Sequence, residues 1–408
     1  IKTGSYQGTG SSTEYEVNVG FEPQWLMVKC ASASEDWVIL DSMRGIVSGG
    51  GDDLVLRANL NNAEVESLSW IDLTPTGFKV NTSAGGVNEG SHTMIYMAIR
   101  RPDPLVQKPA EAGTDVFAMD TGSGSSTIPN FDSGFPVDFA VYREPANTSS
   151  WYNSSRLTAG KELFFNGTDA EAGWAALVFD SNVGWQNHAS HGSERQSWMW
   201  KRHAGFDVVT YEGNGVARQI PHSLNKIPEM IWVKRRDTNK SWGVYHKGLN
   251  GGTNPEQYKI YLNTNDDEEA SDWWNDSAPT STHFHVKTSS SINASGSSQI
   301  AMLFASVKGV SHCGTFTGNG STQTITIPNG GFQPRFLIMK CTSHAVDWQV
   351  LDTTRGWASG NDPYLELNTN AAQYTTNNFG EPTSTGFTLN ENAGFNGSGR
   401  SYIYYAHA

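Results

Sequence analysis

The chain has 408 residues, which at roughly 100 to 200 residues per domain predicts two to four domains. Charged residues make up 17% and aromatic residues 11%, a balance that excludes a disordered chain, because disorder requires high charge and few aromatics. The formal net charge is -13 and the densest basic stretch is only Lys234–Arg236, so the composition disfavours a nucleic-acid partner.

The cysteines and the apolar runs point to a reduced, soluble protein. Cys30, Cys313 and Cys341 cannot form a disulfide framework, and none has the spacing of a zinc or redox pair. No apolar run approaches the roughly 20 residues that cross a bilayer, so we expect no membrane insertion. No secretion signal is recognisable, although the chain begins at Ile1 and an upstream signal stays open.

An internal repeat organises the chain. Ten residues of the first hundred recur in the last hundred at one constant offset, from Phe21 and Phe332 to Leu56 and Leu367. A third copy lies between them, and a divergent copy keeps Trp151 in the expected order. The sequence therefore predicts four domains, namely residues 1–104, 105–205 (divergent), 206–309 and 310–408. Three prolines make Arg101–Gly113 the predicted linker.

The last copy shows the secondary structure most clearly. Its short runs are rich in β-branched and aromatic residues and are separated by Gly, Asn, Pro and Ser, which predicts strands. These strands are 323–327, 335–341, 347–352, 364–368, 386–390 and 401–406. Because Phe336 to Met339 are apolar on both faces, we expect their strand to lie inside the sandwich, with Arg335 and Lys340 marking where it emerges into water. The Asn-Gly pair within Thr317–Gly320 predicts a hairpin turn. The expected fold is all-β, with tandem antiparallel β-sandwich modules of about 100 residues, jelly-roll or lectin-like.

Two sets of repeated residues are expected to be structural. Trp37, Trp242 and Trp348 occupy one equivalent position, and an apolar residue two positions later predicts one buried face, so packing is their expected role. Asp41 with Arg44 recurs as Asp352 with Arg355 across a turn. This spacing favours an ion pair or an Asx-type turn over a ligand contact.

Catalytic and metal-binding signatures are sparse. The sequence has no nucleophile elbow, phosphate loop, HExxH or EF-hand loop, so we expect no catalytic residues, no cofactor and no enzyme activity. A pair of distant acids of the glycosidase type stays open. For two groups of histidines, surface positions are favoured over metal ligation: His188, His191 and His203, and His283 with His285. For the acidic run Asp266–Glu269, a solvated loop is favoured over a calcium site.

Four tryptophans lie in Asn- and Ser-rich connections, where a sugar ring could stack on an indole. Trp70 and Trp274 each precede a proline by five residues, so we expect them to cap the core. Trp273 and Trp357 then remain as candidate exposed rings for sugar binding.

The repeat itself resembles a known family. It combines a GNG turn, a Phe-x-Pro strand entry, Asp-Trp, Asp-x-x-Arg-Gly, an Asn-Thr run, Gly-Phe and the motif at Asn396–Gly399. This pattern resembles the roughly hundred-residue domain of tail fibre and other structural proteins of tailed bacteriophages, especially marine ones. The match is strong over 1–100 and 310–408, good over 206–308 and faint over 113–205. The resemblance implies a virion component, with no catalytic residue to carry over.

Three functional hypotheses follow. The first is a phage virion structural protein, fibre-like or receptor-binding, made in the bacterial cytoplasm and placed in the tail or fibre. Its expected partners are other virion proteins, a host-surface glycan or protein receptor, and copies of itself, with a homotrimer favoured. The alternative is an array of carbohydrate-binding modules in a secreted or phage adhesin. The third, less favoured, is a polysaccharide depolymerase.

Overall fold

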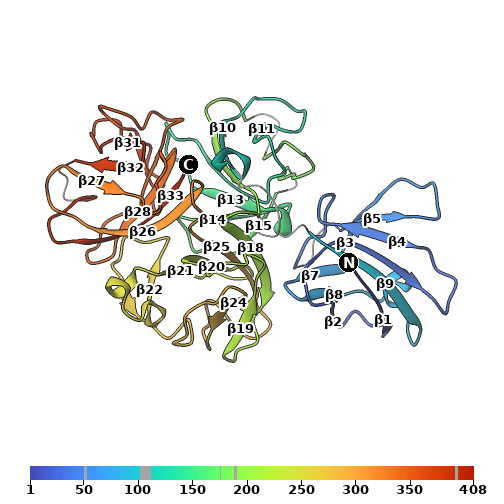
Figure 1. Cartoon of the computed structure of the whole chain (residues 1–408). Coiled ribbons are helices and arrows are strands. Elements are labelled where there is room, and N and C mark those ends of the chain that lie inside the picture. The colour runs from blue at the N-terminus through green and yellow to red at the C-terminus, as the bar shows by residue number, and fades with distance from the viewer. Residues whose placement is uncertain (50–52, 102–111, 175, 188–190, 391–393) are drawn as a thin grey trace.

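The protein is all-β, as the sequence predicts. The computed structural model describes residues 1–49, 53–101, 112–174, 176–187, 191–390 and 394–408. In this part of the chain, antiparallel strands form four large sheets of five or six strands, each with a small sheet of two or three strands. Each pair encloses apolar side chains, which gives four β-sandwich units (Figure 1).

Units 1 and 2 come first along the chain. Unit 1 contains β1 Lys2–Gln7, β2 Tyr15–Asn18, β3 Pro23–Cys30, β4 Val38–Asp41, β5 Asp53–Arg57, β6 Val65–Leu68, β7 Ile71–Thr74, β8 Gly77–Val80, α1 Gly85–Asn88 and β9 Thr93–Arg100. Unit 2 contains η1 Gly113–Asp115, β10 Phe117–Thr121, β11 Phe131–Asp132, β12 Phe139–Arg143, β13 Tyr152–Ser155, η2 Arg156–Thr158, β14 Lys161–Phe164, β15 Ala172–Gly173, β16 Gly184–Trp185 and β17 Gln196–Trp200.

Units 3 and 4 follow. Unit 3 contains β18 Phe206–Glu212, β19 Arg218–Pro221, β20 Met230–Arg235, β21 Gly243–His246, η3 Leu249–Gly252, η4 Pro255–Gln257, β22 Tyr258–Tyr261, β23 Glu269–Ala270, β24 His283–Val286 and β25 Ser298–Phe304. Unit 4 contains β26 Ser311–Thr317, β27 Gln323–Thr326, β28 Phe336–Cys341, β29 Gln349–Asp352, β30 Tyr364–Glu366, β31 Pro382–Thr383, β32 Gly386–Leu389 and β33 Ser401–His407. The described helices are too short to cross a bilayer.

The large sheets share one strand order. In every unit the first strand pairs with the last, which pairs with the third, and the fourth and fifth strands follow, as in β26-β33-β28-β29-β30. The six strands predicted for the last repeat match β27, β28, β29, β30, β32 and β33 to within a few residues. The sequence missed β26 and β31. The predicted hairpin at Thr317–Gly320 is wrong, because β26 pairs with β33 and β27 pairs with β32, so this turn joins two different sheets.

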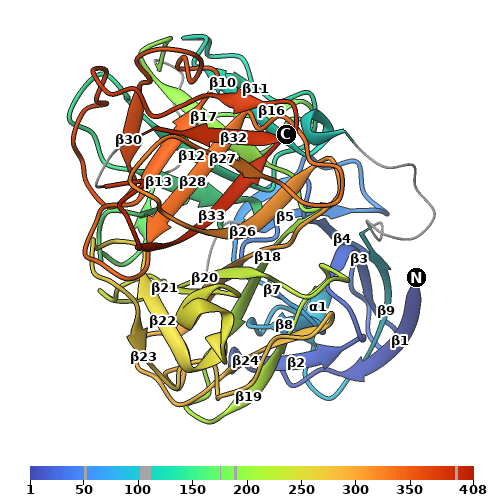
Figure 2. The same cartoon turned by 60° about the vertical axis from the view of Figure 1, so that its left-hand side comes forward.

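Units 2, 3 and 4 pack around a common centre, and unit 1 lies at their side (Figures 1 and 2). Alternate side chains of β12, β20 and β28 explain this packing. In β28, Leu337 and Met339 belong to the interior of unit 4, whereas Phe336 and Ile338 belong to the core shared with the other units. The predicted burial of both faces of this strand is therefore confirmed, and the second face is buried by neighbouring units.

Aromatic rings fill the shared core. Ring centroids of residues from different units lie close together: Phe117 and Phe336 are 5.1 Å apart, Phe165 and Trp232 are 5.3 Å apart, and Phe304 and Tyr405 are 4.9 Å apart. Aromatic pairs at such distances contribute about 0.5 to 1.5 kcal/mol each beyond the area that they bury. The three units consequently share one continuous interior.

Candidate functional site

The contacts between units form the most regular constellation in the protein. One tryptophan of each central unit lies just before the fourth strand of its large sheet, and its indole reaches the neighbouring unit. Each donates its Nε1–H to a main-chain carbonyl: Trp151 to Glu366 (2.8 Å), Trp242 to Phe164 (2.8 Å) and Trp348 to Tyr261 (2.9 Å). Unit 2 thus binds unit 4, unit 4 binds unit 3, and unit 3 binds unit 2. We call units 2–4, joined in this way, the ring.

A cation repeats the same cycle. The residue at the end of the third strand of each large sheet donates to a main-chain carbonyl of the same neighbouring unit: Arg143 to Ala371 (2.7 Å), Lys234 to Thr168 (3.2 Å) and Lys340 to Asn265 (2.9 Å). Burial lowers the pKa of Lys234 and of Lys340 to about 8, and that of Arg143 to about 10. We expected Lys340 to mark where β28 emerges into water. This expectation is wrong, because Lys340 is fully buried.

A main-chain hydrogen bond returns across each interface. The residue two positions after each of these cations accepts a backbone N–H from the neighbouring unit: Pro145 from Gln373 (2.8 Å), Arg236 from Glu171 (2.7 Å) and Thr342 from Glu268 (2.9 Å). All three interfaces therefore use one indole, one cation and one returning amide, in the same order along the chain. Equivalent contacts at three interfaces make the ring a closed assembly of repeated units.

Unit 1 keeps the residues of this interface, but in the described part of the chain no other unit lies on that face. Trp37, the equivalent tryptophan, is 39% exposed, whereas Trp242 and Trp348 are buried. The expectation that Trp37 is buried by packing is wrong. Its backbone N–H still makes the hydrogen bond seen in the other units. Trp37 N–H donates to Asn59 Oδ1 at 2.9 Å, as Trp348 N–H donates to Asn368 Oδ1 at 2.8 Å. The burial of this position depends on a neighbouring unit.

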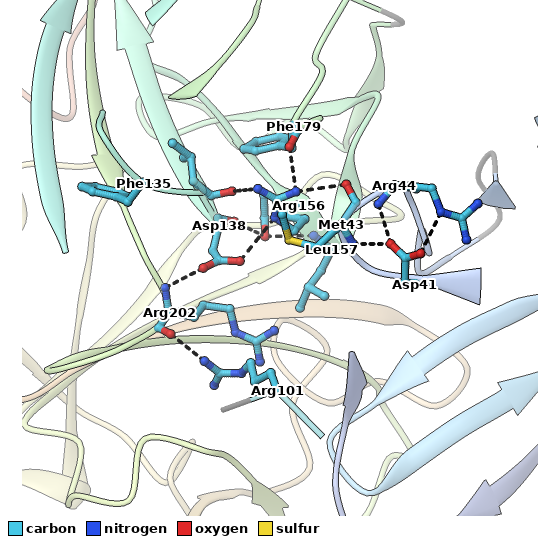
Figure 3. A network of polar contacts seen from close by, with 12 residues as sticks. Asp41, Met43, Arg44, Arg101, Phe135, Asp138, Arg156, Leu157, Phe179 and Arg202 are labelled. Atoms are coloured by element: carbon cyan, nitrogen blue, oxygen red, sulfur yellow. Dashed lines mark hydrogen bonds and ion pairs between the residues drawn. The ribbon is translucent and has the colours of Figure 1, made fainter. Parts of the chain in front are cut away.

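Unit 1 contacts the ring through a buried charged junction, and Figure 3 shows two of its hydrogen bonds, from Arg101 to the Arg202 carbonyl and from Arg156 to the Met43 carbonyl. Arg202 of unit 2 binds both carboxylate oxygens of Glu22 of unit 1, at 2.6 and 2.9 Å, and Asp207 of unit 3 at 2.9 Å. Arg101 donates to the Arg202 carbonyl at 2.6 Å and to Asp207 at 2.9 Å. Arg156 donates to the Met43 carbonyl of unit 1 at 3.3 Å. Three units therefore meet at one charge network.

The charges at this junction stabilise one another. Burial alone would raise the pKa of the Asp207 carboxyl, but Arg202 and Arg101 outweigh burial and hold that pKa below its ordinary value. Burial alone would lower the pKa of Arg202, and Glu22 with Asp207 raises it instead. A cavity of about 180 Å³ is lined by Arg101, Arg202 and His203. Because the guanidinium groups donate to carboxylates and carbonyls, the network acts as a joint between units.

The repeated acid–arginine pairs are ion pairs within their own turns. Arg44 Nε lies 2.7 Å from Asp41 Oδ2, and Arg355 Nε lies 2.7 Å from Asp352 Oδ2. The unit 1 pair is partly exposed and the unit 4 pair is buried. Asp352 also accepts the indole N–H of Trp198 from unit 2 at 3.1 Å, so the buried pair contributes to the ring.

The two candidate sugar-stacking rings are both engaged by the protein. Trp357 is 2% exposed and donates its indole N–H to the Gly380 carbonyl at 2.8 Å, so the expectation that it is exposed is wrong. Trp273 is half-buried, packs over Gly243, and has Lys259 Nζ 4.7 Å from its ring centroid. Of the two predicted caps, Trp274 is buried and Trp70 packs partly buried against the core.

The other candidate ligands are separated. Among the described residues, no group of three His, Cys, Asp or Glu side chains is placed to hold a metal ion, and His188 lies outside the described residues. His203 is buried rather than on the surface. In the acidic run, Glu268 accepts the Asn250 N–H at 2.6 Å and Glu269 pairs with Lys259. Cys30, Cys313 and Cys341 are buried and free. Most of the predicted linker at 101–113 also lies outside the described residues.

Sequence reasoning missed the charged residues that join the units. Arg143, Lys234 and Lys340 lie at the ends of apolar strands, a position that usually marks emergence into water. Arg202 and Asp207 follow no motif. The one available signal was that a cation ends the third strand in every repeat, which a purely solvated position would not require.

Comparisons with known proteins give one family. Residues 1–102 and 121–408 match the family described as a domain of unknown function, DUF7483. No curated protein and no solved structure matches the chain.

Proposed function

The chain belongs to the DUF7483 family, whose description assigns no function, so its function has to be inferred from its structure. From the interfaces between its units, we propose that the protein is a structural subunit of a bacteriophage virion. In this proposal the protein builds a fibre-like or receptor-binding part of the particle. The observation that carries the proposal is the closed ring, in which three repeated units bind one another through the same indole, cation and amide contacts.

The ring supports a mechanical role. The shared aromatic core and the hydrogen bonds to main-chain carbonyls resist separation of the units. Opening one interface exposes apolar surface and leaves buried polar groups without partners. The junction of Arg202, Glu22 and Asp207 attaches unit 1 in the same manner. A rigid body of this kind suits a protein that transmits or withstands force on a particle.

Its loops supply the binding surface in this proposal. Rigid sandwiches that carry Asn- and Ser-rich connections tolerate variation in those connections, which is where recognition of a host receptor is placed. The resemblance of the repeat to tail fibre domains of tailed phages supports the same role. Sugar recognition by Trp273 or Trp357 receives less support, because contacts within the protein already engage both rings.

Location on the particle tests this function. Antibodies against the purified chain, used for immunogold electron microscopy on particles of the phage whose genome encodes it, should label the tail or its fibres. The same antibodies should detect the protein in particles purified by density gradient. Detection only in the soluble fraction of infected cells, with unlabelled particles, would contradict a virion role.

A further inference from the structure

The outer face of the large sheet of unit 1 is an unpartnered copy of the surfaces that form the ring. Two of its apolar side chains are exposed, Trp37 and Ile95, and six are partly exposed, namely Trp25, Met27, Ile39, Leu56, Met97 and Ile99. The strand registers place the corresponding side chains of unit 4 in the shared core: Phe336, Ile338, Trp348, Val350, Leu365, Ile403, Tyr405 and His407. All eight of these residues are buried. The register matches Leu56 to Leu365, and the constant offset that matched it to Leu367 is wrong at this strand.

This face is open to solvent. Trp37 and Ile95 are each 39% exposed. Figure 2 shows β1, β9, β3 and β4 along the side of unit 1 that faces away from the ring, with β7 and β8 on the inner side. The contacts of unit 1 with the ring come from elsewhere, including Glu22, Met43 and Ser48, so the described residues of the ring leave this face uncovered.

The polar groups of the interface are also present in unit 1, at the same spacing. In the ring, the accepting carbonyl lies two residues before the asparagine that binds the tryptophan backbone, and the returning amide lies five residues after it. Counted from Asn59, these positions are the Arg57 carbonyl and the Glu64 amide. Lys29 corresponds to Lys340, and the exposed Ala31 corresponds to Thr342. Unit 1 therefore carries both the donating and the accepting half of the contact.

We propose that this face is the interface of a homotrimer, in which the first units of three copies of this chain pack around a threefold axis as units 2–4 pack within one chain. In each contact, Trp37 Nε1–H donates to the Arg57 carbonyl of the next copy. The Lys29 ammonium group donates to the carbonyl of Asn61, and the Ala31 carbonyl accepts the backbone N–H of Glu64. The occupant is another copy of the chain because the face is complementary to itself.

Three copies follow from the type of contact. A contact between two different patches is heterologous, and it closes after the number of copies that its rotation sets. Within the chain this contact closes after three units. In a dimer, the donating half of one copy and the accepting half of the other would have no partner, and their apolar side chains would stay in water.

The inference does not depend on the proposed function, because it rests only on the repeated interface. Size-exclusion chromatography with light scattering of the full chain at micromolar concentration should give three times the mass of 44.5 kDa. Ile95→Glu and Trp37→Ser should each reduce the mass threefold, to that of the protomer. Val216→Glu, at a side chain 58% exposed in unit 3, is the matched control and should stay trimeric.

A second measurement locates the interface without a variant. Hydrogen–deuterium exchange of the wild-type chain should slow in peptides covering 57–64 when the concentration is raised, because the Glu64 amide gains an acceptor. A monomer or a dimer at micromolar concentration would overturn the proposal. A trimer that survives both substitutions, or one with no added protection over 57–64, would also overturn it, since another face would then hold the copies together.

Discussion

The large sheets of units 1 and 4 have the same strand order and closely corresponding residues, yet one face is buried in unit 4 and open in unit 1. Trp348 and Trp37 make the same backbone contact with an asparagine. The Trp348 indole donates to a main-chain carbonyl, whereas the described residues give the Trp37 indole no such acceptor. The difference shows that this residue pattern encodes an interface between units. The interior of each unit is encoded separately, by the alternate residues of the same strands.

Removing an indole should give the largest difference between the two regions. Trp242→Ala deletes a buried ring and its hydrogen bond to Phe164, so we expect it to lower the free energy of unfolding by about 3 to 5 kcal/mol. Trp37→Ala should cost less than about 1 kcal/mol in the protomer, because the side chain is exposed. Urea unfolding followed by circular dichroism, at concentrations low enough to keep the chain monomeric, measures both values. Equal losses would contradict the assignment of this tryptophan to an interface.

Breaking the junction should have the next largest effect. Arg202→Met leaves Glu22 without its guanidinium partner and Asp207 with Arg101 alone, and an uncompensated buried charge costs about 3 kcal/mol or more. Arg44→Met removes partly exposed pairs with Asp41 and Glu64 and should cost about 1 kcal/mol or less. Thermal unfolding of the two variants provides the comparison. An Arg202 variant as stable as the wild-type protein would show that the junction does not hold unit 1 to the ring.

The fold was predictable because its signals are local. Short β-branched runs separated by turn residues specify strands, and a residue pattern that recurs at a constant offset indicates repeated units. Burial on both faces of β28 followed from four successive apolar residues, Phe336 to Met339. The sequence could not indicate what covers the second face, since a neighbouring repeat and solvent leave the same local pattern.

The site was less predictable because its residues act over long distances along the chain. Lys340 binds a carbonyl of Asn265, and Trp357, in a Ser- and Asn-rich segment, binds one of Gly380. A lysine after an apolar strand and a tryptophan in a polar connection ordinarily face water. Main-chain carbonyls carry no sequence signature, so neither partner could be identified from the residues alone.

The smallest expected contrast is in the response to acid. His246 and His407 lie at interfaces of the ring: burial lowers the pKa of each to about 3, and the His407 ring lies 4.6 Å from that of Phe117. Between pH 3 and the ordinary value of 6.5, the folded state binds fewer protons than the unfolded state. Stability therefore falls as pH falls through this range, by about 1.4 kcal/mol per pH unit for each histidine.

Unit 1 has Asp41 and Ile99 at the corresponding positions, so it contains neither of these two buried histidines. Acid should consequently open the ring before it unfolds unit 1. Urea midpoints from pH 7 to pH 4 should fall less steeply in His246→Gln, which cannot titrate and keeps an acceptor for the Gly248 amide. An unchanged slope would mean that His246 is not a buried neutral group, and the contrast between the two regions would then rest on the indoles alone.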